Sequence, residues 1–464
     1  MYSLGEFLKE PSIRGFFLFL VIFQLEIKNN NKIRRYSYMK YEEILSIFTG
    51  AMLGDAYGLP YEFKGYEIEE KEKGLLHDWS RRKGGRYYPH RARYSKGTYS
   101  DDTQLLLGVA RSMAFEYGNE DFEYFAKVEM PIWVDYNIGA GRAVKNAGEI
   151  LGKCYLWESN KADDYFNAGG NGGLMRIMPI VIKYSSDIET IIRKVYENVV
   201  VTHGHPRAIL GATIYAYYLY LIINKKFSTF EESIELLIKN VSIWGSVLIK
   251  SDSFDSEYWL RLAERYNFSE VWSSTVSSML EILEHIPNMV NKDTESILRE
   301  LGCYSSIKGA GDICALASIC LYGKYRGRVI EGISEIGCKF GIDTDTVCSI
   351  TGALLGGSDT EWLESNKDWL RYLQDYEYVK SLINSVYING ETGVLLGRGF
   401  SNPKVRDKLK DKPVGYKVNA NPFGNIEIER EEYCEVYSDS FTCRVIYCKS
   451  DIGQEISFKY FTRV

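Results

Sequence analysis

The chain has 464 residues, a formal net charge of -6 and 45% hydrophobic residues. This length can bury one large core plus a smaller appendage, and the acidic balance offers no clustered excess of lysine and arginine for nucleic acid. Nine scattered cysteines form neither CxxC pairs nor the even count of a secreted disulfide framework. We therefore expect reduced thiols in a cytoplasmic protein, with protein or small-molecule partners and no nucleic acid.

Residues 1–38 are interpreted as a poorly defined N-terminal extension. Phe16 to Phe23 are eight consecutive apolar residues, superficially like the hydrophobic region of a secretory signal. No small-residue cleavage site follows them, and the run is too short to span a bilayer. Because Met39 directly precedes an ordinary helical pattern, an over-long start assignment is favoured over a membrane anchor, and we expect no stable membrane insertion.

The apolar spacing from residue 40 to about 390 is helical, and alternating strands are scarce. One helical face in 230–241 carries five apolar residues, Phe230, Ile234, Leu237, Ile238 and Val241. Ser228 and Glu231 predict a capping-box start for this helix, whose apolar face we assign to the core. The body, residues 39–405, is therefore predicted to be all-α.

The residue pattern of the sequence changes after about residue 400. The charged stretch 406–415, RDKLKDKPVG, resembles a boundary, and three β-rich runs follow it, IEIEREEYCEVY, FTCRVIYC and EISFKYF. We predict a small β-rich domain over 413–464 that packs on the body or recognises a partner.

The first candidate for chemistry is YSDDTQ, Tyr99–Gln104, directly before the apolar run LLLGVA. Capping of a helix start explains one carboxylate, but it explains two adjacent ones poorly. Ser100, Asp101 and Asp102 together offer the hard oxygen atoms that Mg²⁺ and Mn²⁺ prefer.

A second cluster, GIDTDT at Gly341–Thr346, repeats this chemistry before another small-residue helical stretch. Either cluster alone is equally explained by a capped, solvated helix start. Both together favour a dinuclear site, in which cations offset the repulsion between carboxylates.

Three further loops carry polar residues. In GDAYGLPYEF, Glu62 could ligate a metal, handle a proton or be merely solvated, and Asp55 could simply tie down a turn. The glycine-rich GGNGGLMRIMP could bring backbone N–H groups to phosphate, or be only a turn. In THGHP, His203 is a candidate hydrogen-bonding group for phosphate or ribose, whereas the spacing makes a poor zinc site.

These five motifs, in this order, resemble the ADP-ribosylglycohydrolase family, which includes the dinitrogenase reductase-activating glycohydrolases and the ADP-ribosyl-acceptor hydrolases. The resemblance covers about residues 40–390 and implies an all-α fold enclosing two divalent cations, Mg²⁺ or Mn²⁺. It implies metal ligands at Ser100, Asp101, Asp102, Asp343, Asp345 and Thr346. It also implies catalytic roles for Glu62 and Asp102, and substrate binding by Asn137, Gly139, Gly170, Asn171, Gly172, Gly173, Met175 and His203.

Three positions depart from the family pattern. Ser100 stands where threonine is commoner, Ile342 replaces a glycine, and Asn137 stands where many relatives carry aspartate, with Asp135 two residues earlier.

The resemblance implies a metal-dependent hydrolase that cleaves the N- or O-glycosidic bond between ADP-ribose and a modified protein or related acceptor. Two alternatives stay open: a non-catalytic ADP-ribose-binding scaffold, and a hydrolase of a small ADP-ribosylated metabolite. The acceptor linkage and the oligomeric state are not predicted.

Overall fold

The computed structural model describes residues 39–63, 65–68, 75–115, 120–390 and 405–464. The chain divides into two units, Met1–Ser37 and Tyr38–Val464, and all described residues belong to the second. The predictions for residues 1–38, including the apolar run Phe16 to Phe23, lie outside the described residues.

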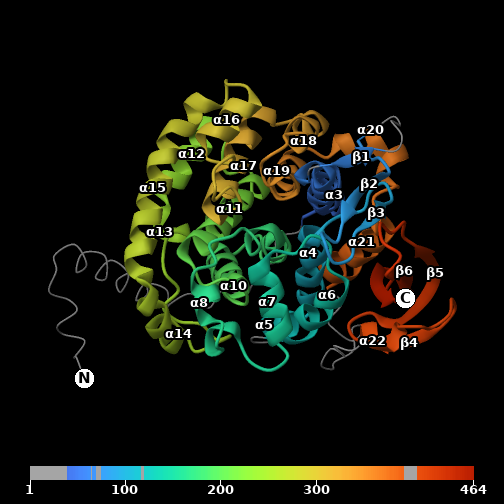
Figure 1. Cartoon of the computed structure of the whole chain (residues 1–464). Coiled ribbons are helices and arrows are strands. Elements are labelled where there is room, and N and C mark those ends of the chain that lie inside the picture. The colour runs from blue at the N-terminus through green and yellow to red at the C-terminus, as the bar shows by residue number, and fades with distance from the viewer. Residues whose placement is uncertain (1–38, 64, 69–74, 116–119, 391–404) are drawn as a thin grey trace. The chain divides into compact units, whose positions relative to one another are not determined.

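Helices dominate the body, which confirms the predicted all-α class (Figure 1). The α-helices before the glycine-rich loop are α3 (Tyr41–Gly58), α4 (Asp101–Ser112), α5 (Glu120–Tyr124), α6 (Met130–Tyr136), α7 (Arg142–Ile150) and α8 (Ala162–Phe166). Those that follow it are α9 (Met178–Lys183), α10 (Ile188–Val200), α11 (Pro206–Ile223), α12 (Phe230–Lys239), α13 (Val241–Trp244), α14 (Ser256–Ala263), α15 (Phe268–Met289), α16 (Thr294–Glu300), α17 (Gly311–Tyr325), α18 (Val329–Gly337), α19 (Thr344–Ser358), α20 (Glu361–Leu370), α21 (Tyr376–Leu382) and α22 (Val405–Leu409).

Short 3-10 and π-helical segments connect or extend these helices. They are the 3-10 helices η2 (Leu59–Glu62), η4 (Leu156–Glu158), η5 (Leu174–Arg176) and η6 (Glu264–Tyr266), and the π-helices η3 (Phe125–Glu129) and η7 (Ile383–Ile388).

The helix predicted over 230–241 is α12, which begins at Phe230 as expected but ends at Lys239. Its N-cap is Thr229, whose side chain accepts a hydrogen bond from the Glu232 N–H at 3.2 Å. The predicted cap at Ser228 is therefore wrong by one residue. Phe230, Ile234 and Leu237 are buried as expected.

A three-stranded antiparallel sheet interrupts the helical body, which the sequence did not lead us to expect. Its strands are β1 (Tyr66–Ile68), β2 (Trp79–Lys83) and β3 (His90–Tyr94), in that order. They are only three to five residues long. Consecutive basic residues in WSRRK break the alternation that identifies a strand in a sequence.

The central packing element is an antiparallel crossing of α3 and α19, which lie side by side in Figure 1. A Cβ atom at Gly50 would lie 2.2 Å from the carbonyl oxygen of Gly352, and one at Gly54 would lie 2.3 Å from that of Cys348. Only glycine permits backbones to approach this closely. The crossing brings the end of α3, at Gly58, against the start of α19, at Thr344.

One described helix, α11, is apolar and long enough to cross a membrane by length and composition alone. Of its residues, 83% are buried inside the fold. It packs against α10 and α17, so its apolar composition is explained by its position in the core.

The C-terminal segment forms one antiparallel sheet, β4 (Lys417–Ala420), β5 (Gly424–Tyr433), β6 (Phe441–Ser450) and β7 (Glu455–Arg463), in sequence order. This sheet confirms the predicted β-rich appendage. It packs on the body: Arg111 of α4 forms a buried ion pair with Glu129 at 2.7 Å and donates to Gln454 Oε1 at 2.6 Å.

Candidate active site

The first acidic turn begins α4. Ser100 is its N-cap, and the Ser100 Oγ accepts a hydrogen bond from the Asp102 N–H at 3.1 Å. The Asp101 N–H donates to the carbonyl oxygen of Ile138 at 2.8 Å. Because the Ser100 hydroxyl and the Ile138 carbonyl already accept from this helix start, the carboxylates of Asp101 and Asp102 are not needed as caps.

Asp55 of α3 holds this turn in place through hydrogen bonds. It is fully buried, and its carboxylate accepts hydrogen bonds from the Ser100 N–H at 2.9 Å, the Thr103 N–H at 2.9 Å and the Thr103 hydroxyl at 2.6 Å. The interpretation that Asp55 ties down a turn is therefore correct, but the turn is the one carrying the acidic pair. Asp55 is a positioning residue.

The second acidic turn lies at the start of α19 and meets the first. The Thr346 hydroxyl donates to Asp102 Oδ1 at 3.3 Å, joining residues 244 positions apart. Lys308 Nζ donates to the carbonyl oxygens of Gly341 at 3.1 Å and Ile342 at 2.9 Å, which fixes the backbone before Asp343. Two clusters remote in sequence thus share one site.

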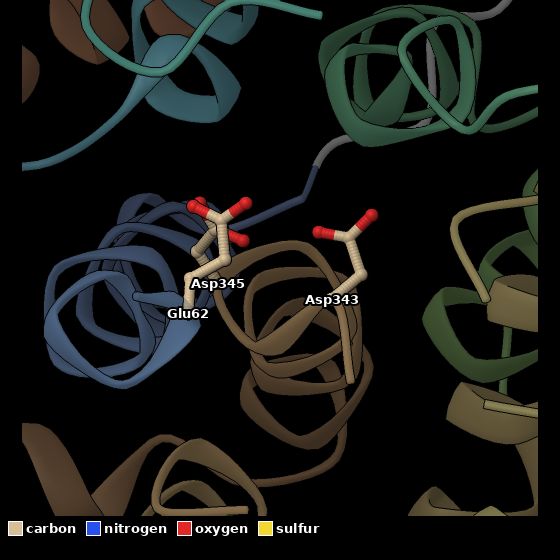
Figure 2. A group of neighbouring side chains, drawn as sticks. All are labelled: Glu62, Asp343 and Asp345. Carbon is tan, nitrogen blue, oxygen red and sulfur yellow. The ribbon is translucent and has the colours of Figure 1, made fainter. Parts of the chain in front are cut away.

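Glu62 completes this group of carboxylates. It lies in the 3-10 helix η2, which continues α3, rather than in an extended loop. Ligand oxygens of Glu62, Asp343 and Asp345 all lie within 4.8 Å of one another. Figure 2 shows the three carboxylates on the same side of the two helix ends.

The electrostatics of this group favour cation binding. Burial, together with the charges of neighbouring carboxylates, raises the pKa values of Asp101, Asp102 and Asp345 well above the ordinary range. Burial, then the charge of Asp343, raises the pKa of Glu62 to about 7. Positive charge placed among these groups would restore their ionised forms.

The residues present fit divalent cations. Asp102 Oδ2 is buried without a hydrogen-bond partner among the described residues, although buried carboxylate oxygens are ordinarily satisfied. The donors are carboxylate and hydroxyl oxygens, the type that Mg²⁺ and Mn²⁺ prefer. Asp101, Asp102, Asp343, Asp345, Thr346 and Glu62 could hold such ions.

The glycine-rich loop is positioned by backbone pairing and by Arg176. Gly170 forms an isolated bridge with Ala310, and the Asn171 N–H donates to the carbonyl oxygen of Gly309 at 2.9 Å. Buried Arg176 donates to the carbonyl oxygen of Gly172 at 2.8 Å. The loop is therefore rigidly held.

Asn171 links this loop to the acidic group. Its side-chain amide donates to Asp343 Oδ2 at 3.0 Å. A Cβ atom at Gly309 would lie 2.7 Å from the same oxygen. The close approach of Gly309 and the amide of Asn171 together orient the Asp343 carboxylate.

The imidazole ring of His203 lies next to the glycine-rich loop and is neutral. Burial, then the charge of Arg176, lowers the pKa of His203 to about 3. Its Nδ1 is hydrogen-bonded to the Thr202 hydroxyl at 2.8 Å. His205 instead caps α11, its ring nitrogen accepting from the Arg207 N–H at 3.2 Å.

The acidic groups and the glycine-rich loop enclose one cavity of about 430 Å³, which we call the acidic cavity. Its lining residues are Glu62, Asp101, Asp102, Gly139, Gly141, Arg142, Ala143, Val144, Asn146, Asp163, Asp164, Asn167, Ala168, Gly170, Asn171, Gly172, Met175, His203, Asp343, Asp345 and Thr346. Most of the candidate residues are therefore brought together.

Three candidates do not line the acidic cavity. Ser100 caps α4 behind it. Gly173 packs on Val199, where an added Cβ would lie 2.8 Å from a methyl carbon. Asn137 donates its amide to the carbonyl oxygen of Val134 at 2.6 Å and lines a different cavity.

Sequence reasoning missed the outer wall of the acidic cavity. Arg142 and Asn146 of α7 and Asp163 and Asp164 of α8 line it. These residues lie on short helices without a recognisable motif, so only the fold shows their position.

Comparisons with known proteins identify the family and two similar proteins. The family model for ADP-ribosylglycohydrolase matches residues 37–393, a range that includes all five motifs. An uncharacterized protein of Archaeoglobus fulgidus is 23% identical over 349 residues, covering 75% of this chain and 96% of that protein. A solved structure described as an ADP-ribosylglycohydrolase-related protein complex covers 75% of this chain and 97% of its own, with 18% identity and a TM-score of 0.48. Because the family model spans most of the chain, including both acidic turns, this protein belongs to the ADP-ribosylglycohydrolase family, which makes it a hydrolase of ADP-ribose conjugates.

Proposed function

We propose that the protein removes ADP-ribose from a modified protein or related acceptor in a reaction that depends on Mg²⁺ or Mn²⁺. The observation that carries this proposal is the meeting of two acidic turns through Thr346 and Asp102, with Asp102 Oδ2 left unpartnered. A structural role alone would not concentrate so many buried carboxylates, because their mutual repulsion destabilises the fold.

The proposed cations would be held by Asp101, Asp102, Asp343, Asp345, Thr346 and Glu62. When bound, such ions polarise sugar oxygens and lower the pKa of water. Asp55 and Asn171 keep the ligands in place through hydrogen bonds to the Thr103 hydroxyl and to Asp343 Oδ2. This positioning reduces the reorganisation that the reaction requires.

Side chains and backbone groups of the protein would transfer the proton, orient water and bind the ADP-ribose moiety. Glu62 is placed to move a proton to or from its carboxylate, because it lines the cavity beside the other carboxylates. Asp102 is placed to orient water. The backbone of Gly170 and Gly172 and the neutral ring of His203 offer uncharged hydrogen-bonding groups to the ADP-ribose moiety.

Two of the departures from the family pattern, Ile342 and Asn137, lie outside the acidic cavity. The Ile342 side chain is fully buried in the hydrophobic core, and Asn137 lines another cavity. Neither therefore removes a group from the proposed chemistry, so hydrolysis remains the better-supported function.

The test uses arginine-, serine- and nucleobase-linked ADP-ribose, together with a small ADP-ribosylated metabolite, each with Mg²⁺, with Mn²⁺ and with a chelator. We expect release of ADP-ribose from at least one substrate only when metal is present. Asp345→Asn should lower kcat/KM by about a thousandfold or more, whereas Asp368→Asn on the exposed face of α20 should not change it.

Metal-independent turnover, or full activity of Asp345→Asn, would contradict the proposed mechanism. Tight binding of ADP-ribose without turnover of any linkage would instead establish the non-catalytic alternative.

A further inference from the structure

A second and larger cavity, of about 920 Å³, lies between the three-stranded sheet and the C-terminal sheet. The two sheets are joined directly: the Arg91 N–H donates to the carbonyl oxygen of Glu435 at 2.8 Å, and His90 forms a bridge with Val436 (Figure 1). Ten basic and six acidic side chains line this space, which we call the cationic cavity.

Two half-buried lysines on its wall face neutral partners. Lys83 Nζ donates to the Tyr94 hydroxyl at 3.0 Å, and Lys459 Nζ lies 3.1 Å from His90 Nε2. Among the described residues, no carboxylate lies within ion-pair distance of either ammonium group. Three other cations of the cavity do have carboxylate partners: Arg91 pairs with Glu67, Arg430 with Glu432 and Lys449 with Glu455.

The protonation of His90 follows from its partners. His90 Nδ1 lies 2.7 Å from the carbonyl oxygen of Tyr88, which can only accept, so Nδ1 carries the proton. His90 Nε2 is then the acceptor for Lys459. Burial, followed by the nearby charges of Lys459 and Lys83, lowers the pKa of His90 and keeps the ring neutral.

The resulting group has more donors than acceptors. Each ammonium carries three N–H donors, and each has one protein acceptor in the described structure. The Tyr94 hydroxyl accepts from Lys83, and its own hydrogen has no acceptor there.

The shifts in pKa agree with this surplus of positive charge. Burial alone would raise the pKa of Tyr94, but the charges of Lys83 and Lys459 lower it overall. Both lysines therefore act on the same hydroxyl. A compact, acceptor-rich dianion would satisfy these donors and neutralise the charges.

We propose that the cationic cavity binds a phosphate group, with Lys83, Lys459 and the Tyr94 hydroxyl as its donors. A tetrahedral phosphate offers several strong acceptor oxygens to donors that converge from two sheets. The volume of the cavity exceeds that of the bare anion, so the group is expected to belong to a small phosphorylated molecule. This site lies apart from the acidic cavity and does not depend on the proposed hydrolysis.

The test is calorimetric titration of the full-length protein, in chelator, with inorganic phosphate and with glycerol 3-phosphate. We expect a dissociation constant of about 1 mM or below for at least one probe. Lys83→Gln/Lys459→Gln should weaken binding about tenfold or more. The control pair Lys226→Gln/Lys239→Gln removes the same charge from exposed positions elsewhere and should bind like the wild type.

The two probes distinguish the source of the phosphate. Tighter binding of glycerol 3-phosphate supports a phosphorylated small molecule, and equal binding of both probes supports the free anion. If Lys83→Gln/Lys459→Gln does not fold, Tyr94→Phe keeps the ring stacked on Trp79, and we expect it to weaken binding about threefold. Failure of both probes to bind the wild type, or equal binding by wild type and the cavity variants, overturns the proposal.

Discussion

The acidic and cationic cavities lie on opposite sides of one wall, the segment 136–141, and they are built differently. Tyr136, Asn137 and Ile138 line the cationic cavity, whereas Gly139 and Gly141 line the acidic one. The acidic cavity lies at the ends of helices whose backbones are in direct contact. The cationic cavity is lined by side chains that extend from two sheets.

Because the two cavities are built differently, like charges are held close together by different means in each of them. In the acidic cavity, buried carboxylates are held together by the crossing of α3 and α19 and by Asp55. In the cationic cavity, the lysines are only half-buried and rest on neutral Tyr94 and His90. Rigid backbone can hold charges that repel one another, whereas flexible side chains require solvent or a ligand.

The largest effect should come from breaking the helix crossing that frames the acidic cavity. Gly54→Ala places a methyl carbon 2.3 Å from the carbonyl oxygen of Cys348, and neither backbone can move aside independently. We expect the free energy of unfolding to fall by about 3 kcal/mol or more, measured by chemical denaturation. Gly152→Ala, where nothing lies within 4 Å, should change it by less than about 1 kcal/mol; equal costs would show that the crossing does not require glycine.

Loss of the positioning carboxylate should have the next largest effect. Asp55→Asn replaces one acceptor oxygen by an amide that faces the N–H of Ser100 or Thr103. In saturating Mg²⁺ we expect the free energy of unfolding to fall by about 2 kcal/mol, because a buried donor loses its acceptor. Unchanged stability, or a change equal to that of the exposed control Asp368→Asn, would contradict this role.

Removal of a proposed metal ligand should raise the free energy of unfolding of the metal-free protein, whereas loss of Asp55 lowers it. Asp102→Asn replaces a buried charge, whose pKa is raised by burial and by Asp55, with a neutral group of the same shape. We expect the metal-free variant to be more stable than the wild type by about 1 to 2 kcal/mol. The increase in Tm that Mg²⁺ gives the wild type should largely disappear. An undiminished response to Mg²⁺ would argue against Asp102 as a ligand.

Much of the helical body and of the acidic cavity could be predicted from sequence. The period of apolar residues after Tyr41 identified α3, and the pairs Asp101–Asp102 and Asp343–Asp345 directly precede or begin helices. Local chemistry of this kind is readable because helix starts and carboxylate spacing are short-range properties.

Long-range partners could not be predicted in this way. The bonds from Asn171 to Asp343 and from Asp55 to Thr103 depend on tertiary packing, and no spacing rule connects the residues. The same holds for Lys459 and His90, which meet only because the segment after β5 pairs with β3. Strands β2 and β3 were missed because their basic residues hide the alternation.

The smallest expected effect concerns the carboxyl group of Asp375, which lines the cationic cavity. Burial raises its pKa to about 7, although Tyr99 and the Glu455 N–H donate to it. Because its folded-state pKa lies above its unfolded value, the folded state holds the proton longer, and stability falls as pH rises towards 7. Between pH 6 and 7, this loss should exceed that of Asp375→Asn by about 1 kcal/mol. Denaturation at both pH values, with exposed Asp439→Asn as control, measures the difference; parallel profiles for wild type and Asp375→Asn would show that Asp375 titrates normally.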